Sequence, residues 1–153
     1  MTRAEEPRGI GETLRLVASR DGTREKRAAA LSAIVRLAGG YRWVGIYDVG
    51  IDEISVVGWS GPAGPTHPRF PITQGLNGAA VASRQTIVVN EVSTDPRYLT
   101  TLGGTRAELV VPVDVNGRIV GTVDVESATA NSFTESDREL VERFALAIAP
   151  LWR

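Results

Sequence analysis

The order and spacing of the apolar residues predict an α+β domain, in which helices pack on one face of an antiparallel sheet. Residues 10–38 keep a helical spacing, and so do residues 134–152 at the other end of the chain. Between them lie two pairs of strand-like segments that are separated by an irregular stretch. That stretch is left to cover the second face of the sheet, and a sheet covered by loops is a natural small-molecule pocket.

The composition is that of one globular domain. The chain has 153 residues, of which 42% are hydrophobic and 23% are charged, and these fractions are near the average for such domains. Residues 1–9 are polar and include Pro7 and Gly9. We therefore expect a flexible N-terminus over residues 1–9 and a single domain over residues 10–153.

The charge balance and the hydropathy exclude several classes of partner. With 17 basic and 18 acidic residues the net charge is -1, which lacks the basic excess of a nucleic-acid-binding domain. No window approaches the roughly 18 apolar residues of a membrane span, and the first residues lack the apolar core of a signal peptide. We expect a cytoplasmic protein with no nucleic-acid or membrane partner.

The chain contains no cysteine and a single histidine, His67. These counts exclude a disulfide framework, a thiolate nucleophile and a zinc–thiolate or iron–sulfur centre. His67 lies in a proline-rich stretch, without a recognisable acid partner or a second metal ligand beside it. The sequence therefore predicts no catalytic residue, no metal site and no cofactor.

The first helical segment has a break near its middle. Apolar residues recur three to four residues apart over residues 10–17 and again over residues 28–38. Asp21-Gly22 separates the two runs, and Gly39-Gly40 ends the second. Two consecutive helices are expected here.

The middle of the chain begins with a β-hairpin and then loses its regularity. Residues 41–49 alternate in polarity, and residues 53–59 supply the second arm of the hairpin. Residues 60–71 hold four prolines and two glycines, a composition that forbids regular structure.

Short elements and a long connection follow the irregular stretch. Residues 75–83 read as a helix of small residues, and residues 86–89 read as a short buried strand. Residues 90–105 form a long connection that contains Asp95-Pro96 and Gly103-Gly104. Loops of this length in a compact domain are usually functional or flexible.

The last part of the chain predicts a second hairpin and a final helix. Two strands, over residues 107–113 and 118–126, flank the turn residues Asn116-Gly117. The helix starts near Thr134. A capping box is formed there either by Thr134 with Asp137 or by Ser136 with Glu139.

Acidic side chains on the last strand are the main candidates for function. Asp124 and Glu126 are two residues apart, so they share one face of the strand with Val120 and Thr122. The opposite, core-facing side then carries Ile119, Val123 and Val125.

Whether Glu108 on the neighbouring strand joins this face depends on the turn. A two-residue type I′ turn at Asn116-Gly117 places residue 108 opposite residue 125, and Glu108 then faces away from Asp124. A three-residue type I turn with a bulge places residue 108 opposite residue 124, and the three acids then converge. Asp114 at the first turn position favours the second arrangement.

Each candidate residue has a structural and a functional interpretation. A convergent acidic trio could hold a ligand ammonium group. Alternatively, the acids are solvated, pair with Arg97 or Arg106, or serve to block edge pairing of the sheet. Trp43 and Tyr47 share a face of the first strand, where they either stack on a ligand or belong to the core.

Five short motifs follow one another along most of the chain. They are Gly75-Leu-Asn-Gly-Ala-Ala-Val-Ala82, Asn90-Glu-Val-Ser-Thr-Asp-Pro-Arg-Tyr98, Glu108-Leu-Val-Val-Pro-Val113, Asn116-Gly-Arg-Ile-Val-Gly-Thr-Val-Asp-Val-Glu-Ser127 and Phe133-Thr-Glu-Ser-Asp137. In this order they resemble the GAF domain family over about residues 25–152. The resemblance implies a sheet with helices on one side and a loop-covered ligand pocket on the other.

Within this family the chain looks most like the free methionine-(R)-sulfoxide reductases, through its compact length and Trp43-Val-Gly-Ile-Tyr47. Those enzymes attack the sulfoxide with one cysteine and resolve the product with others. The resemblance aligns these cysteines near His67, Asn77 and Thr101, none of which can form the sulfenic acid and disulfide of the cycle.

The same resemblance implies a partly retained binding face. Trp43, Tyr47, Glu108 and Asp124 match the substrate-binding positions of that branch. Glu126 stands where the branch usually has Asp, and its side chain is one methylene longer. The binding face is therefore expected to persist without the redox chemistry.

These observations predict a non-catalytic GAF module that acts as a sensor or regulatory protein. It is expected to bind an unknown small polar ligand through Trp43, Tyr47, Glu108, Asp124 and Glu126. One alternative is an enzyme of the reductase type that has lost its thiol chemistry or acts on another substrate. Another is a homodimerisation module that uses the terminal helices within residues 10–38 and 134–152.

Overall fold

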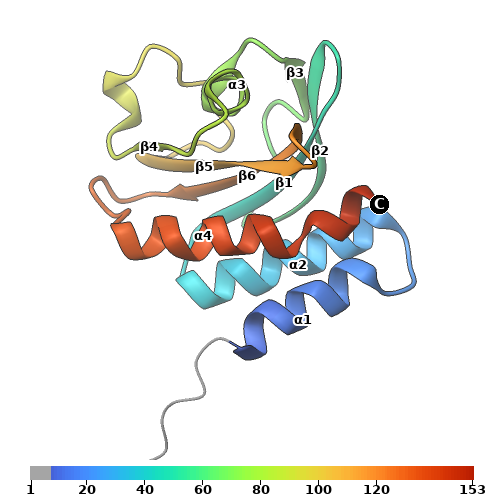
Figure 1. Ribbon diagram of the computed structural model, residues 1–153. Coiled ribbons are helices and arrows are strands. Elements are labelled where there is room, and N and C mark those ends of the chain that lie inside the picture. The colour runs from blue at the N-terminus through green and yellow to red at the C-terminus, as the bar shows by residue number, and fades with distance from the viewer. Residues whose placement is uncertain (1–7) are drawn as a thin grey trace, which may run out of the picture.

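The computed structural model describes residues 8–153, which form a layer of helices, a sheet and a covering layer (Figure 1). The helices are α1 (Arg8–Ser19), α2 (Arg24–Gly39), α3 (Gly75–Ser83) and α4 (Glu135–Ala147). The strands are β1 (Trp43–Val49), β2 (Glu53–Ser60), β3 (Arg69–Pro71), β4 (Ile87–Val89), β5 (Ala107–Val115) and β6 (Arg118–Ser127). Two short 3₁₀ turns, η1 (Val92–Thr94) and η2 (Ala149–Trp152), complete the elements.

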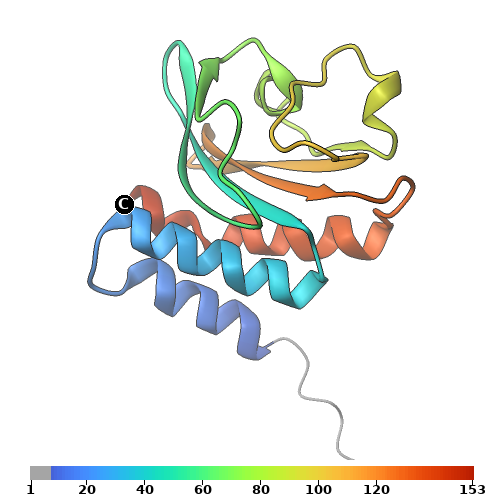
Figure 2. The ribbon, with the colours of Figure 1, turned by 180° about the vertical axis from the view of Figure 1, so that it is seen from behind.

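All six strands belong to one antiparallel sheet, in the order β3-β2-β1-β6-β5-β4. Helices α1, α2 and α4 lie on one side of it, and α3 lies on the other with the connection over residues 90–105 (Figure 2). The predicted α+β class and its arrangement are confirmed. We call the two sides of the sheet the helix face and the loop face.

The helix face carries the main apolar core. Alternate residues of the central strands point toward α2 and α4, because side chains change face at every residue of a strand. Buried members of this cluster include Leu31, Val44, Ile46, Val123, Val125 and Phe144. Each side chain of this size contributes about 1.5–3 kcal/mol when it is fully buried, so this face supplies most of the hydrophobic stabilisation.

The ends of the helices follow the local sequence. The side chain of Thr23 caps α2 by accepting the Lys26 N–H, and Gly40 ends that helix in the left-handed conformation at φ 67°. Thr134 and Asp137 form the predicted capping box at the start of α4. Both caps satisfy backbone groups that the helix itself leaves without partners.

The structure corrects two boundaries and the burial of one strand. Helix α1 includes Arg8 and Gly9, which were expected to belong to the flexible N-terminus; residues 1–7 lie outside the described part. The proline-rich stretch ends in the short strand β3, because an edge position requires no N–H from Pro71. Strand β4 is also an edge strand, and Val89 is its one buried residue, so the prediction of a buried strand was wrong for Val88.

Among the helices of residues 8–153, none is both long enough and apolar enough to cross a membrane.

Candidate functional site

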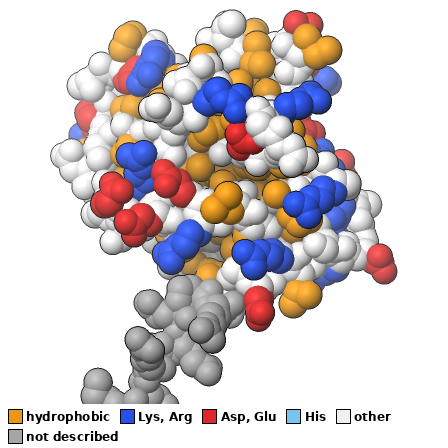
Figure 3. All heavy atoms as spheres, viewed as in Figure 1, with side chains coloured by type: hydrophobic (Ala, Val, Ile, Leu, Met, Phe, Trp, Pro, Cys, Tyr) orange, Lys and Arg blue, Asp and Glu red, His pale blue; other side chains and the backbone are white. Residues whose placement is uncertain are grey.

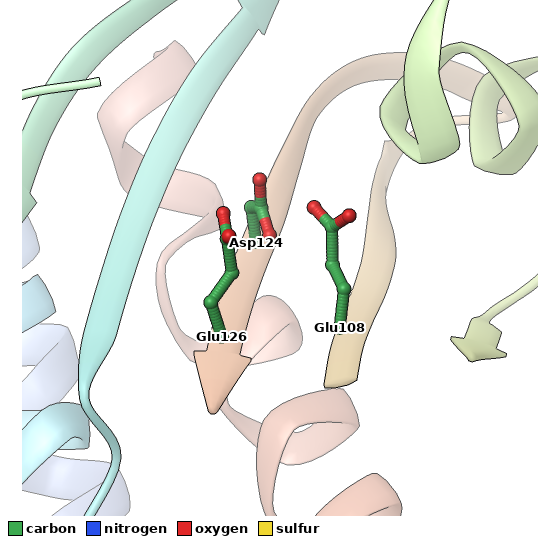
Figure 4. A group of neighbouring side chains, drawn as sticks. All are labelled: Glu108, Asp124 and Glu126. Atoms are coloured by element: carbon green, nitrogen blue, oxygen red, sulfur yellow. The ribbon is translucent and has the colours of Figure 1, made fainter. Parts of the chain in front are cut away.

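Three acidic side chains lie buried together on the loop face. Glu108 projects from β5, and Asp124 and Glu126 project from β6, with relative exposures of 1%, 0% and 0% (Figure 4). One oxygen of each carboxyl group lies within 4.8 Å of the oxygens from the other two. We call these three residues the acidic cluster. Buried carboxylates are normally paired with a cation or fully hydrogen-bonded, so this arrangement requires an explanation.

The register of the β5–β6 hairpin brings the three acids to one face. Asn116 and Gly117 have φ angles of 53° and 84°, which fits the two-residue type I′ turn. Next to the turn, Val115 pairs with Arg118 and Asp114 with Ile119, but Val113 pairs with Gly121. Residue 120 is therefore an extra residue, a bulge that shifts the later pairs by one position.

Because of this bulge, both registers that we expected were wrong. Glu108 lies opposite Glu126, rather than opposite residue 125 or residue 124, and Val110 lies opposite Asp124. Alone, the type I′ turn would have placed Glu108 on the opposite face of the hairpin from Asp124. The bulge returns Glu108 to the face that carries Asp124 and Glu126. Val120 itself packs against the core of the helix face, so its predicted place beside Asp124 was also wrong.

Neutral side chains donate hydrogen bonds to two of the acids. The Asn77 amide and the Thr101 hydroxyl donate to the same oxygen of Asp124, at 3.1 and 3.4 Å. Thr105 donates to Glu126 at 2.7 Å. The Asn77 carbonyl accepts from Thr122 at 2.6 Å, which fixes the orientation of the amide.

Each acid still has one oxygen without a partner. Glu108 Oε1, Asp124 Oδ1 and Glu126 Oε2 are buried and accept no hydrogen bond. The expected alternative of pairing with arginine was wrong, because Arg97 pairs with Asp95 and Arg106 pairs with Glu91. Within residues 8–153, the acidic cluster takes part in no ion pair.

Burial changes the acid–base behaviour of the cluster. The pKa values of Glu108 and Glu126 are raised well above the ordinary range, first by loss of water and then by the charge of Asp124. Burial also raises the pKa of Asp124, while hydrogen bonds from its neighbours act in the opposite direction. Without a bound cation, the cluster therefore holds protons instead of carrying three negative charges.

Two aromatic residues form a wall beside the acids. Trp43 and Tyr47 are almost fully buried, and their ring centroids are 6.4 Å apart. They share a cluster with Phe70, whose ring is 5.8 Å from that of Tyr47 in an edge-on arrangement. The Trp43 ring N–H donates to the Ala63 carbonyl at 3.0 Å. The two rings are thus well packed. They lie beside the acids, because Trp43 is opposite Glu126 in the pairing of β1 with β6.

Tyr47 lies opposite Thr122 in the pairing of β1 with β6, and Thr122 shares its face of β6 with Asp124 and Glu126. The pKa of the Tyr47 hydroxyl is raised well above its ordinary value, first by burial and then by the charges of Asp124, Glu126 and Glu108. All five side chains that the sequence predicted for the site therefore lie in one neighbourhood. Their role in ligand binding remains a prediction.

The side chains that donate hydrogen bonds to the acids were not predicted from the sequence. Asn77, Thr101 and Thr105 come from α3 and from the long connection, far from β5 and β6 along the chain. A signal for two of them existed, because the family resemblance aligned residues 77 and 101 with functional cysteines. The third such position, His67, lies exposed in the loop before β3 and is not among these donors.

A cation is the chemical group that best complements this arrangement. In the described residues, the acidic cluster is the one group of three acidic or metal-ligating side chains close enough to share an ion. The available partners are either an organic ammonium group or a metal ion. The unpartnered oxygens of the acids are hydrogen-bond acceptors. The acidic cluster can therefore stabilise a bound positive charge, and it can release protons when the cation binds.

Comparison with known proteins identifies the family. The family model described as the GAF domain matches residues 23–150. The chain therefore belongs to the GAF domain family, as its sequence motifs indicated.

Two relatives match about two thirds or more of this chain. The chain is similar to YtsP of Bacillus subtilis, at 28% identity over 67% of this chain and 63% of that protein. It is also similar to GAF domain-containing protein A of Dictyostelium discoideum, at 30% identity over 72% and 70%. The chain thus spans less than two thirds of the length of YtsP.

A solved structure shares both the fold and part of the sequence. It is the free methionine-R-sulfoxide reductase from Neisseria meningitidis in complex with its substrate. The match has a TM-score of 0.83 and 27% identity, and it covers 95% of this chain and 87% of that one.

Proposed function

We propose that this chain is a non-catalytic GAF module that binds a small polar molecule through an ammonium group. One observation carries this proposal: three buried carboxyl groups, each with an unpartnered oxygen, converge where the described part of the chain supplies no cation. Leaving such groups unpaired is costly, and a ligand cation removes the cost. Binding that changes the domain without converting the ligand suits a sensor or regulatory module.

The oxygens lie close enough together for one primary ammonium group to reach all three acids. Such a group has three N–H donors in a tetrahedral arrangement. Charge-assisted hydrogen bonds have lengths of about 2.8 Å, which places the three acceptors about 4.6 Å apart. The three carboxyl groups of the acidic cluster offer oxygens within 4.8 Å of one another.

The aromatic wall supports the same class of ligand. Trp43 lies opposite Glu126, and Tyr47 lies opposite Thr122, in the pairing of β1 with β6, and a desolvated cation gains about 2 kcal/mol from a well-placed ring. The hydrogen bonds from Asn77, Thr101 and Thr105 occupy the other oxygens of Asp124 and Glu126. The second oxygens of these two acids, Asp124 Oδ1 and Glu126 Oε2, stay available to a ligand.

Similarity to the Neisseria reductase suggests a first ligand to test. That protein is named for free methionine-R-sulfoxide, which carries an ammonium group. Cysteine-based reduction needs a thiolate, and this chain contains no cysteine. At two positions that the resemblance aligned with cysteine, Asn77 and Thr101 instead donate to Asp124. The acidic cluster would then bind an amine without reducing the ligand.

Isothermal titration with methionine (R)-sulfoxide, with methionine and with an analogue lacking the amino group tests the proposal. We expect an amine-containing compound to bind and the analogue lacking the amine not to bind. The variant Glu108→Gln should abolish binding, whereas Asp114→Asn, at an exposed acid, should leave it unchanged. Equal binding of the compound lacking the amine would contradict the ammonium site. Consumption of the sulfoxide with dithiothreitol would contradict the non-catalytic role.

A second candidate function, homodimerisation, has a separate observation in its favour. An apolar groove of about 530 Å³ lies between α1, α2 and α4, where Leu14, Val35 and Phe144 are among its lining residues. Leu16 and Leu146 on these helices are 71% and 74% exposed. On the face of the molecule in Figure 3, hydrophobic side chains gather between groups of Lys and Arg side chains. Light scattering tests this role: Leu146→Glu should convert a dimer to a monomer, and a monomeric native chain would exclude it.

A further inference from the structure

A pocket separate from the acidic cluster lies beside α3, between this helix and the long connection before β5. Its volume is about 720 Å³, and it opens between the turn before α3, the helix itself and residues 96–99. Most of its wall is apolar, with Ile72, Ala79, Val81, Ala82, Pro96 and Leu99 among the lining residues. None of the acids lines this pocket, so it is distinct from the acidic cluster.

Tyr98 separates this pocket from the acidic cluster. Its side chain lines the pocket, and it also packs against the buried cluster that contains Leu76 and Val110. Val110 follows Glu108 by two residues on the same face of β5, and it lies directly opposite Asp124 on β6. Tyr98 therefore lies between the outer pocket and a buried cluster whose member Val110 is the cross-strand neighbour of Asp124.

Leu99 separates the pocket from the aromatic wall in the same way. It lines the pocket and packs against the cluster formed by Trp43, Tyr47 and Phe70. Tyr98 and Leu99 are consecutive and lie in the long connection between η1 and β5, outside any helix or strand. Moving these two side chains would open the outer pocket toward the buried acids and the aromatic wall, and it would require no change in the sheet.

The electrostatics of Tyr98 agree with this position. Burial raises the pKa of its hydroxyl to about 12, and the charges of Glu126 and Glu108 act in the same direction. Arg97, which also lines the pocket, is paired with Asp95 at 2.7 Å. The charge of Arg97 is thus compensated locally, and the pocket presents mainly apolar surface to a ligand.

We propose that the outer pocket binds the apolar part of the same ligand whose ammonium group occupies the acidic cluster. The ligand class is then a primary amine that carries an extended apolar body. This inference rests on the proposed function, because it needs the ammonium group to be anchored by the acids. It adds a second subsite, walled by α3 and residues 96–99, and it makes Tyr98 and Leu99 the residues that separate the two parts of the site.

A homologous series of straight-chain primary amines, from methylamine to octylamine, tests this inference by isothermal titration. Burial of each added methylene in the outer pocket should strengthen binding by about fourfold. Ala82→Trp should fill the outer pocket, so that affinity no longer increases with the length of the amine. The affinity for methylamine should stay unchanged. The matched control is Ser83→Trp, because Ser83 is exposed on the same helix and does not line the pocket. It should retain the increment.

The outcomes separate the inference from the function on which it rests. If methylamine binds and Glu108→Gln abolishes its binding, the acidic cluster is an ammonium site. If affinity then stays constant along the series, or if Ala82→Trp retains the increment, the outer subsite is overturned while the proposed function stands. If no amine binds, the proposed function and this inference are both overturned.

Discussion

The two faces of the sheet are built from the same strands but have opposite chemistry. On β6, Val123 and Val125 enter the apolar core of the helix face, while Asp124 and Glu126 are buried under α3 and the loops. The helix face gains stability from each buried residue. On the loop face, burial raises the pKa values of the acids and leaves carboxyl oxygens without partners. The stability of one face allows the other to hold buried carboxyl groups with unpartnered oxygens.

The largest expected difference between the faces comes from deleting a buried aromatic ring. Phe144 packs within the helix-face core, and Phe70 packs beside Tyr47 on the loop face. Phe144→Ala should lower the free energy of unfolding by about 3–5 kcal/mol, because helices and sheet leave a cavity that cannot collapse. Phe70→Ala should cost less, because the loops around it can move into the space.

Urea unfolding followed by circular dichroism measures both losses. The two variants remove the same atoms from residues that are 1% and 7% exposed, so the comparison is matched in chemistry and nearly matched in burial. An equal loss for both would mean that the loop face is as tightly packed as the helix face.

Adding a methyl group should show the same contrast with a smaller effect. A Cβ on Gly58 would lie 2.5 Å from the backbone nitrogen of Ala29 in α2, and neither backbone can yield. A Cβ on Gly45 would lie 2.2 Å from the ring of Trp43 on the loop face, where a side chain has to shift. Such overpacking usually costs about 1–3 kcal/mol.

We therefore expect Gly58→Ala to destabilise the chain toward the upper end of this range and Gly45→Ala toward the lower end. The fluorescence of Trp43 should change in Gly45→Ala, because that variant displaces its ring. Thermal unfolding and tryptophan fluorescence of the two variants check the prediction. A larger loss for Gly45→Ala would show that the aromatic wall is the more rigid of the two contacts.

The acids should give the loop face a dependence on pH that the helix face lacks. Above the ordinary pKa near 4.5, the unfolded chain releases its protons, while buried Glu108 and Glu126 keep theirs because their pKa values are raised. The unfolded state then binds fewer protons, so the free energy of unfolding falls as pH rises from 5 to 8. The slope is at most about 1.4 kcal/mol per pH unit for each group.

Glu108→Gln removes the contribution of residue 108 to the pH dependence of the free energy of unfolding. The variant should be more stable than the native chain at pH 8 and nearly equal at pH 5, as measured by urea unfolding at both values. Glu142→Gln is the control, because Glu142 is partly exposed and paired with Arg138, which lowers its pKa. A native chain whose stability rises between pH 5 and pH 8 would contradict a protonated acidic cluster.

Local patterns predicted the alternation of the strands but not the pairing between them. The polarity of residues 43–47 was sufficient to place Trp43 and Tyr47 on one face and Val44 and Ile46 on the other, because alternation is a property of one strand. The register of β5 and β6 also depends on the bulge at Val120. A glycine inside a strand is a recognised sign of a bulge, and Gly121 is the residue that follows it.

Contacts from outside the β5–β6 pair explain why residue 121 is a glycine. A Cβ at residue 121 would lie 2.3 Å from the ring of Trp152 and 2.6 Å from the Tyr47 carbonyl. Such a requirement arises only after the C-terminal turn has packed against the sheet. The donors Asn77 and Thr105 were missed for a similar reason, since their contacts with the acids exist only after α3 and the long connection cover the loop face.

The smallest predicted effect isolates one of these donors. Thr105 donates to Glu126 at 2.7 Å, and Thr105→Val keeps the shape of the side chain but removes the donor. A hydrogen bond to a charged group contributes about 1.5–3 kcal/mol and one to a neutral group about 0.5–1.5 kcal/mol. Because its raised pKa keeps Glu126 protonated between pH 5 and pH 8, the loss should be that of a neutral hydrogen bond, about 1 kcal/mol, at both pH values. Thr105→Ser retains the hydroxyl and should show a smaller loss. A loss that increases between pH 5 and pH 8, measured by urea unfolding, would mean that Glu126 ionises in this range and would contradict the protonated acidic cluster.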